Sequence, residues 1–543
     1  MQPGSTRTAD AIVAQLAAGG VARIYGVIGD AVFPLADALA KQRAVRFVAA
    51  VNETAAAYMA SYEAKLTGRP TACMATSGPG ATQLAAGLAD AYFDGAPVIA
   101  LTGQVATTRF GTGEKQFFDQ QSFFRPITTS TELALDAEGA LHAVLAALNR
   151  AVLHSSVTHV SIPKDVFQQA AQWSPVPLGC PASPADALLL GDRHEALERL
   201  HAAQRPLVVI GLTEANAVQA ALALAEKLGA AVIAAQQAKG AVPFACARLI
   251  GGIGEAHVPP LVTQADLLVL VGDAPYELEF IPPHVPAVVV TNAHRPIRRH
   301  PLIAEFVGAP QGVLKSLHQA LSAQRADGAW QQAIRAVRTS FDQQLRELGE
   351  TDPEPASNPY GLANALSERL AEEAVIAVDT GAFSHWFDLA FRVKRQAVLL
   401  SPRWRAIGYA LPAAIAAKLA CPDRPCVAVV GDGAFLPAMS ELVTAIRYEL
   451  PILVVVVNNA RYDIERQKMS QEGFDVLGTS LYTPDFAAFA QACGAIGIRA
   501  AAADAIDEAL ERAVAATADN GGPPVVLDVR TSVPALRHLV PAY

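Results

Sequence analysis

The chain is poor in cysteine and in charged residues, and it has no long apolar run. Six cysteines scattered over 543 residues are too few for a disulfide framework, which indicates a reducing compartment. The net charge of −9, without a basic stripe, excludes the electrostatic footprint of a nucleic-acid-binding surface. Apolar runs such as 267–271 are far shorter than the roughly 20 residues that span a bilayer, and the N-terminus lacks an apolar signal core. We therefore expect a soluble cytoplasmic protein without nucleic-acid or membrane partners.

Apolar residues are abundant instead, because 52% of the chain is hydrophobic and only 17% is charged. This balance is typical of α/β enzymes whose parallel strands are buried on both faces. Two stretches rich in Pro, Ser and Gly, 174–186 and 349–359, are read as linkers. Between them, short Val/Ile-rich segments precede Ala/Leu-rich helical segments, which is the pattern of βαβ units. We predict three doubly wound parallel-sheet α/β domains over residues 1–175, 187–345 and 358–543.

The strongest motif combines Gly-Asp-Gly after one apolar strand with Asn-Asn after the next. Asp432 and Asn459 are 27 positions apart, with a helical segment and a strand between them. Their oxygens suit a hard cation such as Mg²⁺, which commonly shares its ligands with phosphate oxygens. Gly431 and Gly433 would let the backbone approach a phosphate closely, and the helix that follows presents free N–H groups. The alternative is a tight turn and an ordinary strand-ending loop. The combination favours the metal site.

Gly-Asp-Gly followed at this distance by Asn-Asn resembles the metal and diphosphate signature of thiamine diphosphate enzymes. The resemblance implies that Asp432, the side chain of Asn459 and the main-chain carbonyl of Arg461 bind Mg²⁺. It implies that the cofactor-binding residues of this part of the chain are Gly381, Ile407, Gly431, Asp432, Gly433, Ala434 and Asn459. From the sequence alone, Ile407 could equally be an ordinary core residue. In the family, a bulky apolar residue at its position is wedged between the two cofactor rings.

A catalytic carboxylate is expected in the first third of the chain. Thiamine chemistry requires deprotonation of a carbon acid, and a buried carboxylate helps by stabilising a proton on the aminopyrimidine ring of the cofactor. Glu53 follows a strand-like segment and opens a helical one, where a lone Glu is ordinarily a solvated residue. Residues 52–105 resemble the pyrimidine-binding domain of the acetolactate synthase and pyruvate oxidase group, which implies that Glu53 is the activating glutamate. Many relatives have His where this chain has Asn52.

Two further segments match the same group. Residues 77–80 (Ser-Gly-Pro-Gly) form either a simple turn or the loop beside the pyrimidine ring, and the second reading gives Ser77, Gly78 and Gly80 as cofactor contacts. In FGTGEKQFFDQQSFF, the resemblance implies that Gln116 reaches the reaction centre as a catalytic residue. The usual Gln-Glu pair is Gln-Phe here, and the acidic residue has moved to Asp119.

Some relatives also bind FAD in the central domain. Here the strand LLVLVG runs into DAPYELEF in place of their arginine-containing segment, and VVVTNAHRP replaces an acidic strand end suited to ribose hydroxyls. The segment 251–254 (Gly-Gly-Ile-Gly) partly resembles a flavin loop. We expect thiamine diphosphate and Mg²⁺ as cofactors, with FAD as the alternative that these departures disfavour.

The resemblance covers nearly the whole chain and implies a lyase or transferase similar to acetolactate synthase. It would decarboxylate a pyruvate-like 2-oxo acid and join the product to a second carbonyl. The alternatives are an enzyme similar to sulfoacetaldehyde acetyltransferase, suggested by Asp119 and Gln120, an FAD-dependent pyruvate oxidase, and a catalytically silent regulatory relative. Asp463 is relevant to the silent relative, because relatives usually have glycine at this position, close to the cofactor. Since the family builds each site from two chains, we expect a homodimer or homotetramer with its active site at the dimer interface.

Overall fold

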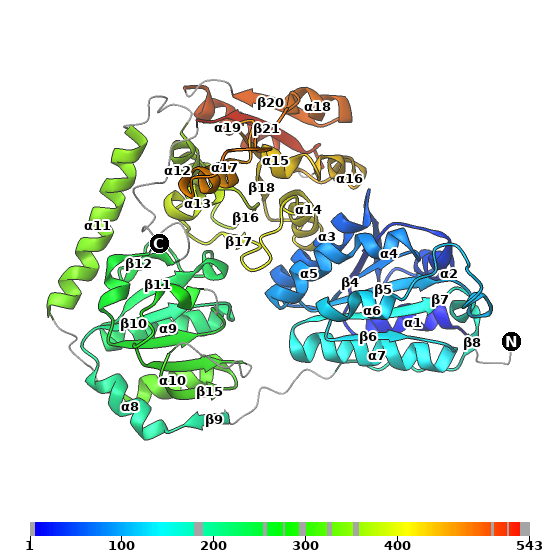
Figure 1. Cartoon of the computed structure of the whole chain (residues 1–543), viewed down its shortest axis with the longest axis horizontal. Coiled ribbons are helices and arrows are strands. Elements are labelled where there is room, and N and C mark those ends of the chain that lie inside the picture. Colours follow the sequence, from blue (N-terminus) through cyan, green and yellow to red (C-terminus); the bar gives the residue numbers. More distant parts are fainter. Residues whose placement is uncertain are drawn as a thin grey trace.

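The computed structural model describes residues 6–178, 188–253, 258–274, 277–292, 300–322, 328–350, 358–500, 504–518 and 521–532. These residues form three α/β domains, each built around one parallel or mostly parallel sheet. Figure 1 shows the N-terminal domain on the right, the central domain at the lower left and the C-terminal domain above both. The predicted fold class, three doubly wound domains, is confirmed. Most of the two predicted linkers lies outside the described residues.

The N-terminal domain has a six-stranded sheet in which every pairing is parallel. In sheet order its strands are β3 (Arg46–Ala49), β2 (Arg23–Gly26), β4 (Thr71–Ala75), β5 (Val98–Gln104), β7 (Val157–Pro163) and β6 (Ser130–Leu133). Its helices are α1 (Thr8–Ala18), α2 (Phe33–Ala40), α3 (Glu53–Thr67), α4 (Pro79–Gln83), α5 (Ala85–Asp94), α6 (Gln120–Phe124) and α7 (Ala137–His154). A small antiparallel pair, β1 (Thr6–Arg7) and β8 (Ala170–Ala171), joins the two ends of the domain.

The central domain has a seven-stranded sheet with one antiparallel edge strand. In sheet order its strands are β12 (Leu249–Ile253), β11 (Ala231–Ala235), β10 (Pro206–Ile210), β13 (Leu267–Val271), β14 (Ala287–Thr291), β15 (Leu302–Val307) and β9 (Leu188–Gly191). Its helices are α8 (Arg193–Ala202), α9 (Ala215–Leu228) and α10 (Pro310–Ala320). The long helix α11 (Gly328–Glu350) then runs alongside this domain toward the C-terminal domain (Figure 1).

The C-terminal domain has a six-stranded sheet, again with parallel pairings throughout. In sheet order its strands are β17 (Ala397–Leu399), β16 (Val375–Val378), β18 (Cys426–Gly431), β19 (Ile452–Asn458), β21 (Val525–Arg530) and β20 (Ile496–Ala500). Its helices are α12 (Pro359–Arg369), α13 (Ala382–Ala390), α14 (Ala410–Ala420), α15 (Asp432–Phe435), α16 (Leu442–Arg447), α17 (Asp463–Gln471), α18 (Phe486–Cys493) and α19 (Asp504–Ala516).

The segment after Gly-Asp-Gly differs from the single helix that the sequence suggests. Helix α15 ends after four residues, and a 3-10 turn over Met439–Glu441 precedes α16. Pro437 lies in the break, where it supplies no backbone N–H to continue the helix. The helix that begins at Asp432 is therefore a single turn, and its dipole is that of one turn only.

Helix α3 of the N-terminal domain packs against α14 of the C-terminal domain, and one hydrophobic core runs through both. The rings of Tyr62 and Tyr409 stack across this contact with centroids 4.8 Å apart. The two domains are thus joined through helices. The carboxyl ends of their strands take no part in this helix contact. No helix in the described part of the chain combines the length and the apolar character needed to cross a membrane.

Candidate functional site

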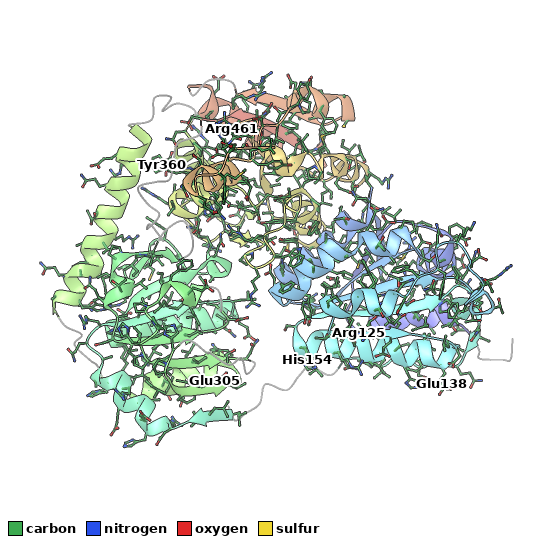
Figure 2. The ribbon with its side chains drawn as sticks, in the orientation of Figure 1. Arg125, Glu138, His154, Glu305, Tyr360 and Arg461 are labelled. Atoms are coloured by element: carbon green, nitrogen blue, oxygen red, sulfur yellow. The ribbon has the colours of Figure 1, made fainter. Side chains whose placement is uncertain are left out.

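A cavity of about 490 Å³ lies at the carboxyl ends of β16, β18 and β19 in the C-terminal domain. Parallel α/β sheets bind ligands at this edge. All the site residues predicted for the C-terminal domain line this cavity: Gly381, Ile407, Gly431, Asp432, Gly433, Ala434, Asn459 and Arg461. Figure 2 shows Arg461 in this domain, near the top of the view.

Asp432 is the residue of the cavity whose chemistry is most distinctive. Its side chain is 2% exposed, and Oδ1 accepts a hydrogen bond of 2.9 Å from the backbone N–H of Gly433. Oδ2 is buried and has no hydrogen-bond partner among the described residues. Burial raises the pKa of this carboxyl group, and hydrogen bonds from the surrounding backbone N–H groups lower it by a smaller amount. A buried carboxylate oxygen without a partner fits a bound cation, which would satisfy it.

Asn458 and Asn459 have different surroundings. Asn458 is fully buried, donates from Nδ2 to Asp528 and accepts from Arg530, so it holds β19 to β21. Asn459 is the first residue after β19 and lines the cavity. Its Oδ1 accepts a 3.2 Å hydrogen bond from the backbone N–H of Arg461 and retains a second lone pair. Asp432 and Asn459 thus place side-chain oxygens at the ends of adjacent strands, and oxygen atoms are the ligands that a hard cation such as Mg²⁺ prefers.

The glycines of the cavity are required for space rather than for left-handed backbone. A Cβ atom on Gly433 would lie 2.4 Å from Cε1 of Tyr462, and one on Gly431 would lie 2.8 Å from Cε1 of Phe383. Gly381 is restricted by the same phenylalanine ring, at 2.6 Å. A side chain at any of these positions would displace an aromatic wall of the cavity. The bare backbone keeps room for a group such as a diphosphate.

Ile407 is not a core residue, because its side chain is 43% exposed and faces the cavity. Asp379, at the end of β16, holds the loop that carries it. The Asp379 carboxylate accepts backbone hydrogen bonds of 3.1 Å from Gly408 and 2.9 Å from Ala410. It is fully buried, and this burial raises its pKa to about 7 despite these bonds.

Asp379 is expected to make the stability of the protein depend on pH. Its folded-state pKa of about 7 lies above the ordinary value of 3.8, so the unfolded chain releases the proton first as pH rises. This group's contribution to stability is therefore largest below about pH 4 and falls through about pH 7, by up to about 1.4 kcal/mol per pH unit. Thermal melts of wild type and Asp379→Asn across this range measure it. A gap between the two melting temperatures that stays constant with pH would contradict the assignment.

The N-terminal residues form a second cluster. Glu53 is the first residue of α3, is 8% exposed, and follows Asn52, whose Oδ1 caps the helix by accepting from the backbone N–H of Ala55 at 2.9 Å. A Cβ atom on Gly80 would lie 2.8 Å from Oε1 of Glu53, so only glycine leaves room for the carboxylate beside this loop. Ser77 is buried in the same loop.

Gln116 lies against that loop with strained backbone. A Cβ atom on Gly78 would be 2.7 Å from Cβ of Gln116, whose φ of +64° is uncommon for a residue other than glycine. Asp119 caps α6 by accepting from the backbone N–H of Ser122 at 3.0 Å. The acidic residue that the sequence shows as displaced is therefore a helix cap in this structure. Gln120 is buried and donates to the carbonyl of Gly103 at 2.9 Å.

The N-terminal cluster is separate from the lining of the C-terminal cavity. Glu53, Gln116 and the 77–80 loop do not line the C-terminal cavity. Several apolar side chains near the strand ends of both domains are exposed, among them Ile28, Val51, Phe117 and Ile407.

Three residues that line the cavity, Arg405, Glu465 and Lys468, were not assigned to it from the sequence. Position alone could have suggested Glu465 and Lys468, because α17 begins four residues after Asn459. Asp463, where relatives usually have glycine, also lines the cavity, and its buried Oδ1 has no hydrogen-bond partner in the described part of the chain.

The arginines and the tryptophan before Ile407 have separate surroundings. Arg403 pairs with Asp273 and donates to the carbonyl of Phe93 at 2.7 Å, so it joins the three domains. Trp404 stacks on Phe93 with ring centroids 4.9 Å apart. Arg405 reaches the cavity and donates to Gln236 of the central domain at 3.1 Å.

The segments that bear on FAD are only partly described. Gly251 and Gly252 line a smaller cavity of about 60 Å³ between the central and C-terminal domains, beside the ion pair of Lys239 and Asp388 at 3.5 Å. Gly254 and residues 293–299 lie outside the described residues. The expectation that FAD is disfavoured stays a prediction.

Comparison with known proteins gives three matches to models of thiamine pyrophosphate enzymes, thiamine pyrophosphate being another name for thiamine diphosphate. The N-terminal TPP binding domain matches residues 6–123, the central domain matches residues 193–317, and the C-terminal TPP binding domain matches residues 379–529. The three matches follow one another in the same order as the three sheets.

The chain is also similar to curated proteins over most of its length. A protein of Bacillus subtilis (strain 168), YdaP, whose name describes it as thiamine pyrophosphate-containing, is 29% identical over 524 residues, which cover 94% of this chain and 89% of that protein. The catabolic acetolactate synthase of Raoultella terrigena is 30% identical over 545 residues, 95% of this chain and 94% of that enzyme. The acetolactate synthase isozyme 1 large subunit of Escherichia coli (strain K12) is 29% identical over 477 residues, 85% and 83% of the two chains. The chain therefore belongs to the thiamine diphosphate-dependent enzymes, in the group of acetolactate synthase and pyruvate oxidase.

Proposed function

We propose that the protein decarboxylates a pyruvate-like 2-oxo acid and joins the resulting fragment to a second carbonyl compound, using thiamine diphosphate and Mg²⁺. The single observation that carries this proposal is a buried oxygen of Asp432 that has no hydrogen-bond partner among the residues described, in a cavity that is lined by glycines and by Asn459. The similarity to acetolactate synthases over nearly the whole chain supports the choice of reaction.

Each residue has a distinct task in this proposal. Asp432, Asn459 and the carbonyl of Arg461 hold Mg²⁺, and the backbone at Gly431, Gly433 and Ala434 faces the diphosphate. Gly381 leaves room for the cofactor, and Ile407 supports its bent shape. When bound, thiamine diphosphate supplies a carbon nucleophile and accepts the electrons released by decarboxylation.

The N-terminal cluster completes the chemistry. The Glu53 carboxylate holds a proton on the pyrimidine ring of the cofactor, and Ser77, Gly78 and Gly80 form the loop beside that ring. Gln116 reaches the substrate. The acidic cap Asp119 does not take the place of the glutamate that usually follows this glutamine, so the substrate contacts here differ from those of the relatives.

A second copy of the chain brings the two clusters together in this proposal. Glu53 does not line the cavity of Asp432 in its own chain, and the exposed Ile28, Val51 and Ile407 near the strand ends suit a contact surface. We propose a homodimer or homotetramer with the active site at its interface, and a cytoplasmic location, which the unpaired cysteines of the described residues support. Sedimentation analysis tests the assembly, and a fully active monomer would contradict it.

Identification of the products tests the reaction. The protein is incubated with isotopically labelled pyruvate, thiamine diphosphate and Mg²⁺, and the labelled products are separated. Acetolactate is expected. In a parallel incubation with sulfoacetaldehyde and inorganic phosphate, formation of acetyl phosphate and sulfite would select the acetyltransferase alternative. Acetate and hydrogen peroxide formed from pyruvate and oxygen by a yellow flavoprotein would select the oxidase. No product from protein that has bound the cofactor would indicate a silent relative.

Replacing Asp463 by Asn is expected to tighten the binding of thiamine diphosphate about fivefold near neutral pH. The Asp463 side chain is 6% exposed, lies in the cavity, and would repel the diphosphate when ionised. Burial raises the pKa of Asp463, so the carboxyl group is protonated more readily and the difference should shrink as pH falls. Calorimetric titration measures the affinity, and Glu472→Gln, at the exposed end of the same helix, is the control. Weaker binding by Asp463→Asn would instead mean that the carboxyl group contacts the cofactor favourably.

A further inference from the structure

The strand end that precedes Glu53 is held by side chains of the C-terminal domain. The backbone N–H groups of Val51 and Asn52 both donate to Oε1 of Glu441, at 2.9 and 3.1 Å. Two residues earlier, the backbone N–H of Ala49 donates to the hydroxyl of Tyr448 at 2.7 Å. Three hydrogen bonds therefore join the segment before α3 to a different domain.

Glu441 itself is fixed. It is fully buried at the end of the 3-10 turn that follows α15, and its Oε2 accepts a 2.7 Å hydrogen bond from the hydroxyl of Thr444. Both carboxylate oxygens are thus engaged, and the backbone that carries them comes nine residues after Asp432. Hydrogen bonds from backbone N–H groups to an ionised carboxylate are stronger than those to a neutral acceptor.

These bonds act on the residue that sets the direction of α3. Asn52 is the N-cap of the helix, with extended backbone at φ −141° and ψ 162°, and Glu53 is the first helical residue. The N–H of an N-cap residue has no partner inside its own helix, so Glu441 satisfies a group that would otherwise depend on water. A shift of the Asn52 backbone would move Glu53 against the tight surface of Gly80.

We propose that Glu441 is a positioning residue for Glu53, which ties the start of α3 to the domain that holds the metal ligands. The inference rests on the proposed function, because it assumes that Glu53 acts on the cofactor. In a dimer with active sites between the chains, the metal ligands and Glu53 of one chain would serve two different active sites. Glu441 would then connect these two sites through its own chain. The link runs through main-chain hydrogen bonds and needs no movement of protons.

The test uses two substitutions of Glu441 in the full-length protein. Glu441→Met keeps the side-chain length and removes the acceptor, whereas Glu441→Gln retains a carbonyl oxygen that can accept from Val51 and Asn52. Tyr448→Phe is the matched control, because it removes the neighbouring contact to Ala49 and leaves the Glu441 bonds intact.

Two readouts are measured besides activity. Amide hydrogen exchange of the peptide around residues 49–56, in protein without cofactor, reports the bonds directly. Exchange of the C2 proton of bound thiamine diphosphate for deuterium reports the action of Glu53, and calorimetry gives the cofactor affinity.

The expected result is at least about a 10-fold slower C2 exchange in Glu441→Met, as positional errors near a reacting centre can cost up to about 100-fold. C2 exchange in Glu441→Gln should lie within a few-fold of wild type. Of the two Glu441 variants, only Glu441→Met should show faster amide exchange at Val51 and Asn52, and both should keep the cofactor affinity. C2 exchange in Tyr448→Phe should remain closer to wild type than in Glu441→Met. If Glu441→Met does not fold, equal slowing in Glu441→Gln and Tyr448→Phe would overturn the proposal.

Glu53→Gln separates this inference from the proposed function. If Glu53→Gln leaves C2 exchange unchanged, the role of Glu53 is wrong. If Glu53→Gln slows it and Glu441→Met melts at a lower temperature with normal C2 exchange, only the positioning role is wrong, and Glu441 serves stability alone.

Discussion

Glu53→Gln is expected to lower kcat for 2-oxo acid turnover by at least about 100-fold, since general acid–base groups contribute about 10² to 10⁴. Glutamine keeps the size of the side chain and loses the negative charge that stabilises the proton on the pyrimidine ring. Glu53 is 8% exposed and enclosed by the loop at Gly80, so solvent is poorly placed to replace it. The rate of CO₂ release under saturating cofactor measures the effect.

A matched control is available in the same domain. Glu138 lies in the first turn of α7 and is highly exposed, at the lower right of the N-terminal domain in Figure 2. Glu138→Gln should therefore leave kcat unchanged. A Glu53→Gln variant that retains more than half of the wild-type rate would show that another group performs the activation.

Asp432→Ala is expected to weaken Mg²⁺-dependent binding of thiamine diphosphate by more than about 100-fold. Loss of a residue that only supports a metal ligand typically costs about 10- to 100-fold, and a ligand itself should cost more. Calorimetric titration in the presence of Mg²⁺ measures the affinity. Asp423→Ala is the control, because Asp423 lies exposed before the opposite end of the same strand, β18.

The direction in which Asp432→Ala changes the melting temperature is an independent test of the metal-ligand role. Burial raises the pKa of Asp432, and Oδ2 has no partner in the part of the chain that is described, so the ionised side chain is costly without a cation. Without cofactor and metal, Asp432→Ala should melt at the same temperature as wild type or higher. A clear loss of stability in the cofactor-free protein would instead make Asp432 a structural residue.

Local sequence patterns predict the fold well, and the residues that they single out in the C-terminal domain line one cavity. Strands β18 and β19 are apolar apart from Asn458 and pair in parallel, so Asp432 and Asn459, which follow them, lie at the same edge of the sheet. The helical segment expected over 437–450 is shorter in the structure, where a 3-10 turn over Met439–Glu441 precedes α16 and a separate single turn, α15, lies before Pro437. Ile407 could not be assigned from the sequence, because exposure is set by the loop that Asp379 holds.

Contacts between segments that are distant in the sequence could not be predicted from it. Glu441 and Val51 are 390 residues apart, and the pattern around Glu441 is that of an ordinary helical residue. The same limit applies to Arg403, whose bond to Asp273 crosses from one domain to another. The site roles of Glu53, Gln116 and the metal ligands remain predictions, supported by burial and by the cavity.

The most direct measurement is CO₂ release from a panel of 2-oxo acids, with thiamine diphosphate and Mg²⁺ present together, singly or absent. Release from pyruvate or a close relative that requires both cofactors is the predicted result. Protein that binds thiamine diphosphate and releases no CO₂ from any acid of the panel, or that releases it without thiamine diphosphate, would contradict the central claim.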